Sequence, residues 1–350
     1  MAKKSLKDVK VNNTAQVLGC IIKNDQVSRI EISEKTKLSP STVSQAVALL
    51  IEKGIAEEVC SGESTGGRRP ILLRLNPGYG FIVTLEIKRS GVDVQIFNLR
   101  GALLGDQILA KRRLSGNDLL TLAETYIQSL EIDGGKIPGK LVGIGLLCQD
   151  DIPEYDLNVE FSTSFSSDVI SLEKVLSTKF GVPVKKELIN RYSLDYYLQS
   201  VDAKCTDYAY INIGERVTAS FVLNRTLVHN TSDSVFDISS AVLSGNYAGT
   251  EGNQARGMAR TQEISMRNLP IEKIADKLAE VLKNALLFFP VNDIFIGGQV
   301  ENIEVVVNRV AKEFALHPVV RKAEAADRHV NHALAYRILT ENYRLLVGMS

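Results

Sequence analysis

The stretch from Ser39 to Pro77, SPSTVSQAVALLIEKGIAEEVCSGESTGGRRPILLRLNP, is the most informative part of the chain. It predicts a helix capped by Ser39, with Pro40 at the first position, where a missing N–H costs nothing, and with Gly54 at its end. Two short β-like runs follow, IAEEV (55–59) and PILLRL (70–75), joined by a polar loop. A short polar-faced helix followed by a hairpin with adjacent arginines suits a double helix better than a small metabolite.

Two shorter helices are predicted before this stretch, at residues 14–23 and at residues 29–36 behind a Ser28 cap. Three helices followed by a hairpin indicate a winged helix-turn-helix. The helix alone fits an ordinary amphipathic surface equally well, and the arginine-bearing wing favours contact with double-stranded DNA. The candidate DNA-binding residues are Ser39, Ser41, Thr42, Ser44 and Gln45 on the helix, and Arg68 and Arg69 in the loop.

The composition is that of a globular chain, because 45% of its 350 residues are hydrophobic and 23% are charged. No apolar run approaches the roughly 20 residues of a membrane span, so no membrane partner is expected. Net charge is zero, yet residues 1–75 hold twelve basic against eight acidic side chains, which fits a DNA-binding head. The four cysteines are isolated, which favours reduced thiols and a cytoplasmic protein.

From residue 79 onward the pattern changes to strands alternating with helices. Strands are expected at 81–88, 91–98, 102–110, 141–147 and 182–188, with helices at 118–130, 172–180 and 191–201. A similar order then recurs, with strands at 208–214, 219–224, 226–230, 293–298 and 317–322, and helices at 271–289, 303–314 and 331–347. Two such halves indicate an α/β body of two lobes with a cleft between them. The predicted domains are 1–77 (winged helix), 78–202 (first lobe) and 203–350 (second lobe), with the closing helix returning toward the first lobe.

The winged-helix segment resembles the ROK family (repressor, open reading frame, kinase) of transcriptional regulators. In the body, GKLVGIGLL, FGVPV and DIFIGG follow the order of that family. The resemblance spans nearly the whole chain, and it implies an actin-like ATPase (ribonuclease H-like) fold for the body.

The same resemblance implies that the kinase chemistry is lost. The segment matching the phosphate turn reads LEIKRSGV, with Glu86 for the usual aspartate and with Lys88 and Arg89 in places where the kinases have glycine. An ungapped match puts Leu188 and Ile189 on the Asn-Asp pair that supplies the general base, and Ile189 cannot accept a proton. We therefore expect no ATP binding, no catalytic residues and no enzyme activity.

The sugar-recognition and zinc motifs of the family are also altered. Residues 237–240, Asp-Ile-Ser-Ser, take the place of the sugar-binding glutamate-x-glycine-histidine. The stretch that carries zinc ligands in relatives, residues 244–263, contains neither Cys nor His, so we expect no zinc and no metal site. The candidate effector-binding residues are Glu187, Asn190, Asp237 and Ser240.

These observations predict a sequence-specific transcriptional regulator, a repressor of carbohydrate-related genes that binds a double-stranded operator as a homodimer or homotetramer. Its body would oligomerise and bind a sugar or another small effector. Two alternatives stay open at this point: an active ATP-dependent sugar kinase, or a body that binds a protein or a non-sugar effector.

Overall fold

A computed structural model describes residues 6–60, 71–132, 137–149, 152–162, 167–189, 205–214, 216–228, 236–243, 270–298, 300, 302–315, 317–323 and 326–348. The chain divides into two compact units. The first comprises Met1–Glu187 and Asn331–Ser350, and the second comprises Leu188–Val330. The second unit is therefore inserted between two stretches of the first. The three-part division expected at residues 77 and 202 stays a prediction.

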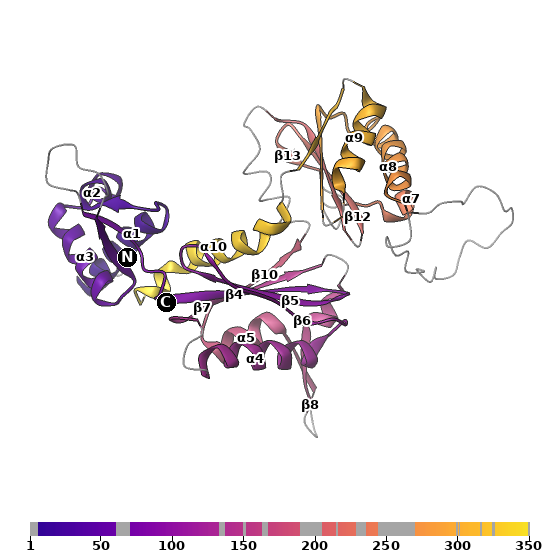
Figure 1. The fold of residues 1–350 in the computed structure, drawn as a ribbon. Coiled ribbons are helices and arrows are strands. Elements are labelled where there is room, and N and C mark those ends of the chain that lie inside the picture. The colour runs from indigo at the N-terminus through magenta and orange to yellow at the C-terminus, as the bar shows by residue number, and fades with distance from the viewer. Residues whose placement is uncertain are drawn as a thin grey trace, which may run out of the picture. The chain divides into compact units, whose positions relative to one another are not determined.

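The first unit begins with three helices and a small antiparallel sheet of order β1-β3-β2 (Figure 1). Its elements are α1 (Leu6–Ile22), β1 (Val27–Ser28), α2 (Arg29–Thr36), α3 (Pro40–Glu52), β2 (Ala56–Cys60) and β3 (Ile71–Leu75). Apolar residues from all three helices and β3 form its core, and Leu18, Ile32, Leu50 and Leu73 are fully buried there. This is the predicted winged helix-turn-helix order.

Side-chain caps fix where the second helix of this domain begins. Ser28 and Glu31 form a reciprocal capping box: the Glu31 N–H donates to Ser28 Oγ (3.2 Å), and the Ser28 N–H donates to Glu31 Oε2 (2.8 Å). These bonds satisfy backbone donors that lack a partner within the helix.

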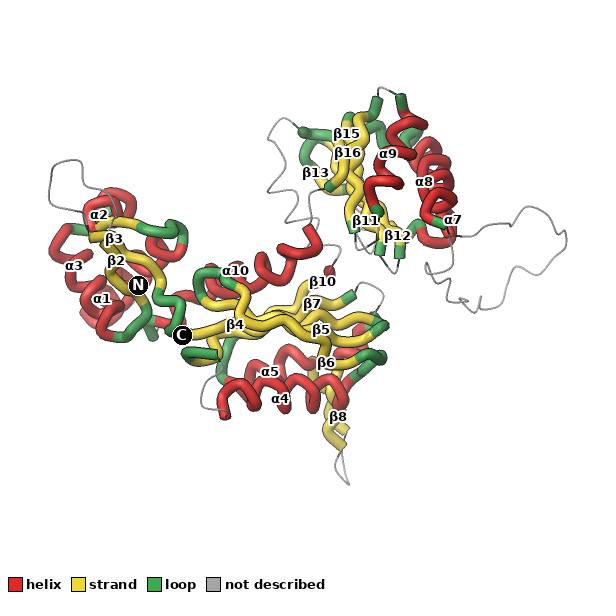
Figure 2. Tube along the Cα trace, viewed as in Figure 1, coloured by secondary structure: helices red, strands yellow, loops and turns green. Residues whose placement is uncertain are grey.

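The rest of the first unit is a five-stranded sheet of order β10-β7-β4-β5-β6. Its strands are β4 (Gly80–Lys88), β5 (Gly91–Asn98), β6 (Leu103–Ala110), β7 (Lys140–Cys148) and β10 (Val184–Leu188). Helices α4 (Gly116–Ile132) and α5 (Leu172–Phe180) cover one face, and α10 (Ala326–Leu346) covers the other (Figure 2). The parallel pair β4–β7 is central and buried, as expected for strands covered on both faces.

A hairpin of this unit was not predicted from the sequence. After the short 3-10 helix η1 (Glu154–Leu157), strands β8 (Asn158–Ser162) and β9 (Ser167–Ser171) form an antiparallel hairpin. The Asn117 side chain binds the backbone of β8, since its Nδ2 donates to the Glu160 carbonyl (3.0 Å) and its Oδ1 accepts from the Glu160 N–H (2.9 Å). The Asn117 side chain thus makes the two backbone hydrogen bonds that a neighbouring strand would make to Glu160.

The second unit has a mixed sheet of order β13-β12-β11-β15-β16, with β14 also paired to β12. The strands are β11 (Tyr208–Ile213), β12 (Val217–Leu223), β13 (Thr226–Leu227), β14 (Phe236–Asp237), β15 (Asp293–Gly297) and β16 (Val319–Lys322). Its helices are α7 (Ser239–Leu243), α8 (Ile271–Ala285) and α9 (Ile303–Phe314). Within the described residues, no helix is long and apolar enough to span a bilayer.

Helix α8 ends four residues earlier than predicted. After Ala285 the chain makes successive turns, and the Phe289 ring stacks on Phe221, with ring centroids 4.6 Å apart. Pro290 follows directly, and its ring disfavours a helical backbone conformation at the preceding residue, Phe289. The helix expected at 191–201 lies outside the described residues.

Candidate nucleic-acid interface and effector site

The first turn of α3 is organised by the hydroxyl group of Ser39. Ser39 Oγ accepts the Thr42 N–H (3.2 Å), and it lies within hydrogen-bond distance of Ser41 Oγ (2.9 Å) and Thr42 Oγ1 (2.8 Å). Three of the five helix residues predicted to contact DNA are thus linked to one another. Ser39 acts as the N-cap of α3, so its hydroxyl supports the helix end.

Beyond this turn, α3 separates an apolar face from a polar one. Val43, Val47 and Leu50 are fully buried against the other helices. Ser44 and Gln45 are exposed, and neither side chain makes a hydrogen bond to another described residue. Gln and Ser side chains on the amino-terminal half of such a helix have the donors and acceptors that match base edges. Ser44 and Gln45 are therefore the α3 side chains best placed to contact bases.

The turn that leads into α3 presents a lysine that was not singled out from the sequence. Lys37 ends α2 in the left-handed conformation, with φ of 59°, and its side chain is exposed. The turn is held by Ser33, whose Oγ donates to the Leu38 carbonyl at 2.7 Å. An exposed ammonium beside the recognition helix is suited to contact a phosphate. In the sequence, only the excess of basic residues in 1–75 indicated that a lysine of this segment would contact DNA.

The base of the wing is fixed by ion pairs, while its tip lies outside the described residues. Strands β2 and β3 pair antiparallel from Ala56–Leu75 to Cys60–Ile71. Arg29 on α2 pairs with Glu58 on β2 (2.5 Å), and Arg74 on β3 pairs with Glu57 (2.6 Å). Arg68 and Arg69 fall in the undescribed residues 61–70, so their role stays a prediction.

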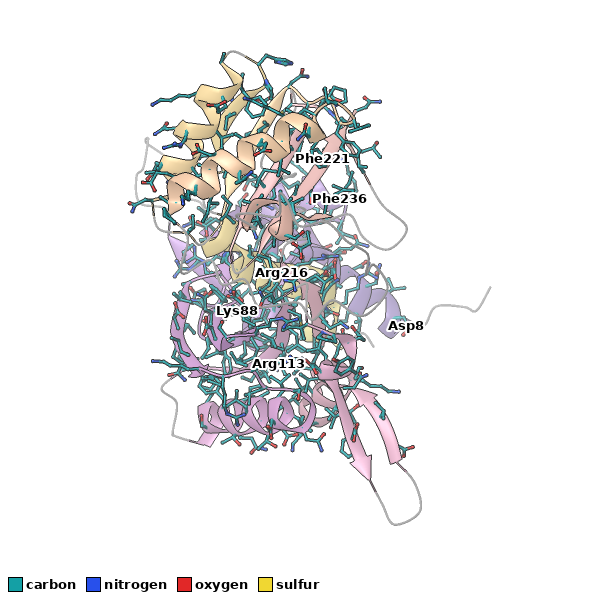
Figure 3. All side chains as sticks on the ribbon, turned by 90° about the vertical axis from the view of Figure 1, so that its right-hand side faces the viewer. Asp8, Lys88, Arg113, Arg216, Phe221 and Phe236 are labelled. Atoms are coloured by element: carbon teal, nitrogen blue, oxygen red, sulfur yellow. The ribbon has the colours of Figure 1, made fainter. Side chains whose placement is uncertain are left out.

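In the body, the place expected for a phosphate turn holds an internal ion pair. The ammonium of Lys88, which is labelled in Figure 3, contacts Asp93 on β5 and lies 3.6 Å from Glu86 on β4. Burial opposes its charge, but Glu86 and Asp93 outweigh burial and raise the pKa of Lys88. Glu86 also accepts a hydrogen bond from Asn331 Nδ2 on α10 (3.2 Å). The Lys88 charge is thus already balanced within the first unit.

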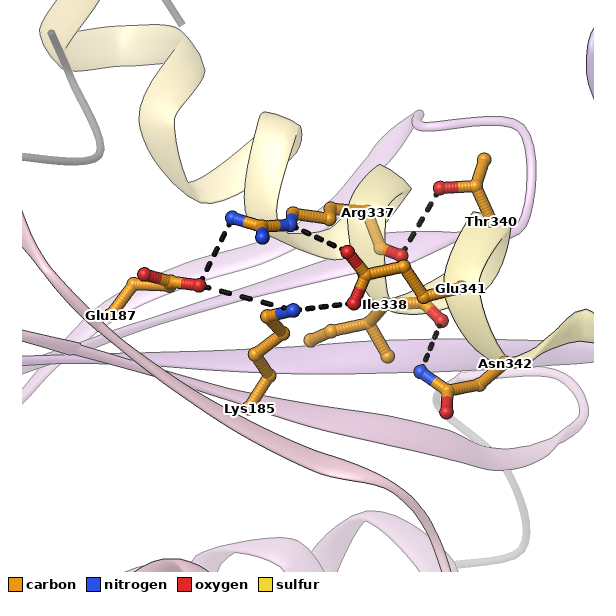
Figure 4. Close-up of polar contacts among 7 residues, drawn as sticks. All are labelled: Lys185, Glu187, Arg337, Ile338, Thr340, Glu341 and Asn342. Carbon is orange, nitrogen blue, oxygen red and sulfur yellow. Dashed lines mark hydrogen bonds and ion pairs between the residues drawn. The ribbon is translucent and has the colours of Figure 1, made fainter. Parts of the chain in front are cut away.

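Glu187, a candidate effector ligand, belongs to a four-residue ion-pair network between β10 and α10 (Figure 4). Arg337 pairs with Glu187 (3.0 Å) and with Glu341 (2.8 Å), while Lys185 contacts Glu341 and lies 3.9 Å from Glu187. Positive and negative groups alternate around the network, so each cation has two carboxylate neighbours. A ligand that bound Glu187 would compete with Arg337.

The neighbours of Glu187 give no general base at the predicted position. Ile189 is partly buried and apolar, and Asn190 lies outside the described residues. Glu187 falls in the first unit, whereas the other candidates fall in the second.

Asp237 of the second unit is likewise engaged by its own chain. Its carboxylate pairs with Arg216, labelled in Figure 3, and accepts the Ser239 N–H at 2.9 Å. Burial raises the pKa of Asp237, but the bonds from Ser239 and Arg216 outweigh it, so that the pKa is lowered. Ser240, the next residue of α7, is exposed. Asp237 thus binds the backbone at the amino end of α7.

Among the residues that the structure describes, no three His, Cys, Asp or Glu side chains gather closely enough to hold a metal ion. The stretch expected to have lost its zinc ligands, residues 244–263, lies outside the described residues. The expected absence of zinc therefore stays a prediction.

Comparison with known proteins identifies the winged helix and relatives of the chain. Residues 13–57 match a family of winged helix-turn-helix DNA-binding domains. The chain is 27% identical over 234 residues to the xylose repressor of Bacillus subtilis, covering 64% of this chain and 58% of that one. It is 31% identical over 99 residues to the transcriptional dual regulator NagC of Escherichia coli, covering 28% of this chain and 24% of that one. The matches thus span less than two thirds of these relatives' length.

A solved structure described as a ROK family transcriptional regulator, homologous to the Escherichia coli Mlc protein, superposes with a TM-score of 0.60. The match covers 97% of this chain and all of the other at 14% identity, a level that shows the fold alone. The predicted fold class is confirmed: a winged helix-turn-helix precedes a two-lobed body of the actin-like sugar-kinase type.

Proposed function

We propose that this relative of the ROK-family transcriptional regulators is a sequence-specific DNA-binding repressor of carbohydrate-related genes. The observation that carries the proposal is the polar face of α3, where Ser44 and Gln45 are exposed beside the buried Val43 and Val47. A helix of this kind enters the major groove with its amino-terminal residues at the base edges. The likeness to xylose and N-acetylglucosamine repressors supports carbohydrate genes as the targets.

We further propose that the protein binds its operator as a homodimer or homotetramer. One winged helix covers about half of a two-fold operator, and two half-sites lie one helical turn of DNA, roughly 34 Å, or a multiple of it apart. The body would supply the contacts between copies. A repressor acts where the DNA is, which makes the cytoplasm its compartment.

The body in this proposal binds an effector and performs no phosphoryl transfer. Lys88 is paired with Glu86 and Asp93 where backbone N–H groups would need to approach a phosphate. Ile189 offers no carboxylate to accept a hydroxyl proton. These residues support a body that holds no ATP, and residues 244–263, which contain neither Cys nor His, support one that holds no zinc. The effector would be a sugar or another small molecule.

Electrophoretic mobility shifts with genomic fragments test the proposal. The wild-type protein should select specific fragments at physiological salt, and the absence of any selected fragment would refute the proposal. Replacing both wing arginines (Arg68→Ala and Arg69→Ala) should weaken binding and make the slope of log affinity against log salt shallower by about 1.8. A control that removes two exposed body cations, Lys111→Ala with Arg112→Ala, should leave that slope unchanged.

Calorimetry with ATP and a panel of sugars tests the loss of kinase activity. We expect no heat of ATP binding and no turnover of any sugar. Turnover of a single sugar would overturn the roles given to Lys88 and Ile189, while leaving the DNA-binding proposal to the mobility-shift experiment.

A further inference from the structure

The winged helix is attached to the body of the first unit by a short, well-bonded linker. Residues 76–79 separate β3 from β4. Asn76 Nδ2 donates to the Gly54 carbonyl (2.8 Å) on the winged-helix side, and Asn76 Oδ1 accepts the Gly78 N–H (2.9 Å). On the body side, the Lys140 ammonium lies 4.6 Å from the centre of the Tyr79 ring. The linker is thus bonded at both ends.

A second attachment joins α10 to α1. The Tyr343 ring packs directly against Gly19, because a Cβ built on Gly19 would lie 2.9 Å from Tyr343 Oη. Gly19 is buried within α1, beside the core residue Leu18. Only a glycine lets the ring approach the helix backbone this closely.

A third attachment is an ion pair between Arg100, in the turn joining β5 to β6, and Asp25, in the turn after α1. The Arg100 turn is itself held by Asn98, whose Oδ1 accepts the N–H groups of Arg100 and Ala102, each at 2.9 Å. The Asp25 side chain is 73% exposed, so this ion pair adds little to the free energy of unfolding. Its main effect is on the orientation of the winged helix relative to the body.

Helix α10, which carries Tyr343, is firmly seated on the sheet of the body. Leu334 and Ile338 lie over Gly145 and Gly143 of β7, where an added Cβ would come within 2.7 Å and 2.5 Å of these side chains. The network of Lys185, Glu187, Arg337 and Glu341 ties the same helix to β10. The place of Tyr343 is therefore set by the body.

We propose that Tyr343 and Arg100 are positioning residues for operator binding, which hold the winged helix in one orientation on the body. Three separated attachments fix a rigid domain, whereas the linker alone leaves it free to rotate. A fixed orientation raises the effective concentration of the second winged helix at a second half-site, and it restricts the half-site spacing that can be bound. The inference rests on the proposed function for its DNA component only.

The orientation itself can be measured without DNA. Spin labels attached by bioorthogonal chemistry at the exposed positions Ala48 (α3) and Lys111 (body) report the distance between winged helix and body. The wild-type protein should give a narrow distance distribution, and Tyr343→Ala should broaden it. Tyr343→Phe, which keeps the ring over Gly19, should restore the narrow distribution. The matched control is Tyr336→Ala, an exposed tyrosine on the same helix, which should leave the distribution narrow.

The DNA component is measured with operators whose half-site spacing is changed by one or two base pairs. Tyr343→Ala should bind the best-spaced operator about tenfold more weakly and tolerate altered spacing, with unchanged affinity for a single half-site. An unbroadened distribution in Tyr343→Ala would overturn the positioning role, and a broadened one with unaltered spacing preference would overturn its link to operator binding. If the wild-type protein selects no genomic fragment in the mobility shifts, the proposed function fails. The distances between the spin labels still show whether Tyr343 fixes the orientation of the winged helix on the body.

Discussion

The polar face of α3 and the carboxylates of the candidate effector site are used differently by the rest of the protein. On α3, the side chains of Ser44 and Gln45 are exposed and make no hydrogen bond to another described residue. In the body, Glu187 is bound by Arg337, and Asp237 by Arg216. Polar groups that bind a macromolecule can stay hydrated on an open surface, whereas the charge of a half-buried carboxylate such as Glu187 is balanced by a cation of the same chain.

This difference separates two kinds of binding energetics. DNA bound at α3 breaks no side-chain hydrogen bond between Ser44 or Gln45 and another described residue, because both side chains are exposed in the free protein. A ligand at Glu187 or Asp237 would compete with Arg337 or Arg216, and its net affinity would be reduced by any ion pair that it breaks. Binding there would consequently alter the contacts between β10 and α10, or between Arg216 and α7, which is what a sensing body requires.

The largest expected effect is on DNA recognition at α3. Gln45→Ala should lower discrimination between the operator and a mutated operator by about 2 kcal/mol, because a bidentate contact to a base edge is lost. Competition mobility shifts measure this discrimination, and the melting temperature should stay unchanged because Gln45 is exposed. Gln16→Ala, which alters an exposed glutamine on α1, is the control and should leave discrimination intact. If Gln45→Ala and Gln16→Ala lowered operator discrimination equally, α3 would not be the helix that contacts the bases.

The next effect separates helix capping from base contact on the same helix. Ser39→Ala removes the acceptor of the Thr42 N–H and should destabilise the winged helix by about 1 kcal/mol in denaturant unfolding. Ser44→Ala, which removes an exposed hydroxyl with no partner among the described residues, should leave stability unchanged and weaken operator binding. If Ser39→Ala lost binding without losing stability, Ser39 would belong with the base-contacting residues.

A smaller effect is expected in the body. Glu187→Gln leaves Arg337 with Glu341 as its remaining carboxylate partner within the four-residue network and should lower the free energy of unfolding by about 0.5 kcal/mol. Affinity for a single half-site should not change, because the network lies outside the winged helix. Glu160→Gln, at an exposed position of β8, is the control for loss of one carboxylate and should be neutral. A neutral Glu187→Gln would mean that the network adds no stability.

The smallest effect is a pH dependence from Glu341. Burial raises the pKa of Glu341, but Lys185 and Arg337 outweigh it and lower the pKa below its ordinary value of 4.5. A lowered pKa in the folded state gives stability that is fully present above about pH 4.5 and is lost as pH falls through the folded pKa. Melting curves of wild type and Glu341→Gln should therefore differ at pH 6, and the difference should shrink as the pH falls below 4.5. If the two melting temperatures differed by the same amount at every pH, the loss of stability in Glu341→Gln would come from altered packing and not from the charge of Glu341.

The winged helix was largely predictable because its signals are local. Ser28 and Ser39 mark helix starts within four residues of the groups they cap, and the buried Val43, Val47 and Leu50 follow helical spacing. The β8–β9 hairpin was missed because its sequence, NVEFSTSFSSDVIS, alternates weakly and lacks a glycine or proline turn.

The partners of the effector candidates were not predictable, since they depend on contacts far apart in the chain. Arg337 meets Glu187 across 150 residues, and Arg216 meets Asp237 across 21. Of the network, only the Arg337–Glu341 spacing of four residues on one helix is visible in the sequence. Which charge neutralises which carboxylate is decided by the packing of α10 on β7 and β10.

The seat of α10 on Gly143 and Gly145 has a consequence for the order in which the protein is made. Domains generally fold as the chain emerges during synthesis, the earlier ones first. Here β7 emerges early, but the helix that covers its glycines follows the whole second unit. The ribosome therefore releases every residue of the second unit before the first unit can close its core, and the apolar face of β7 is the surface that a chaperone would need to protect meanwhile.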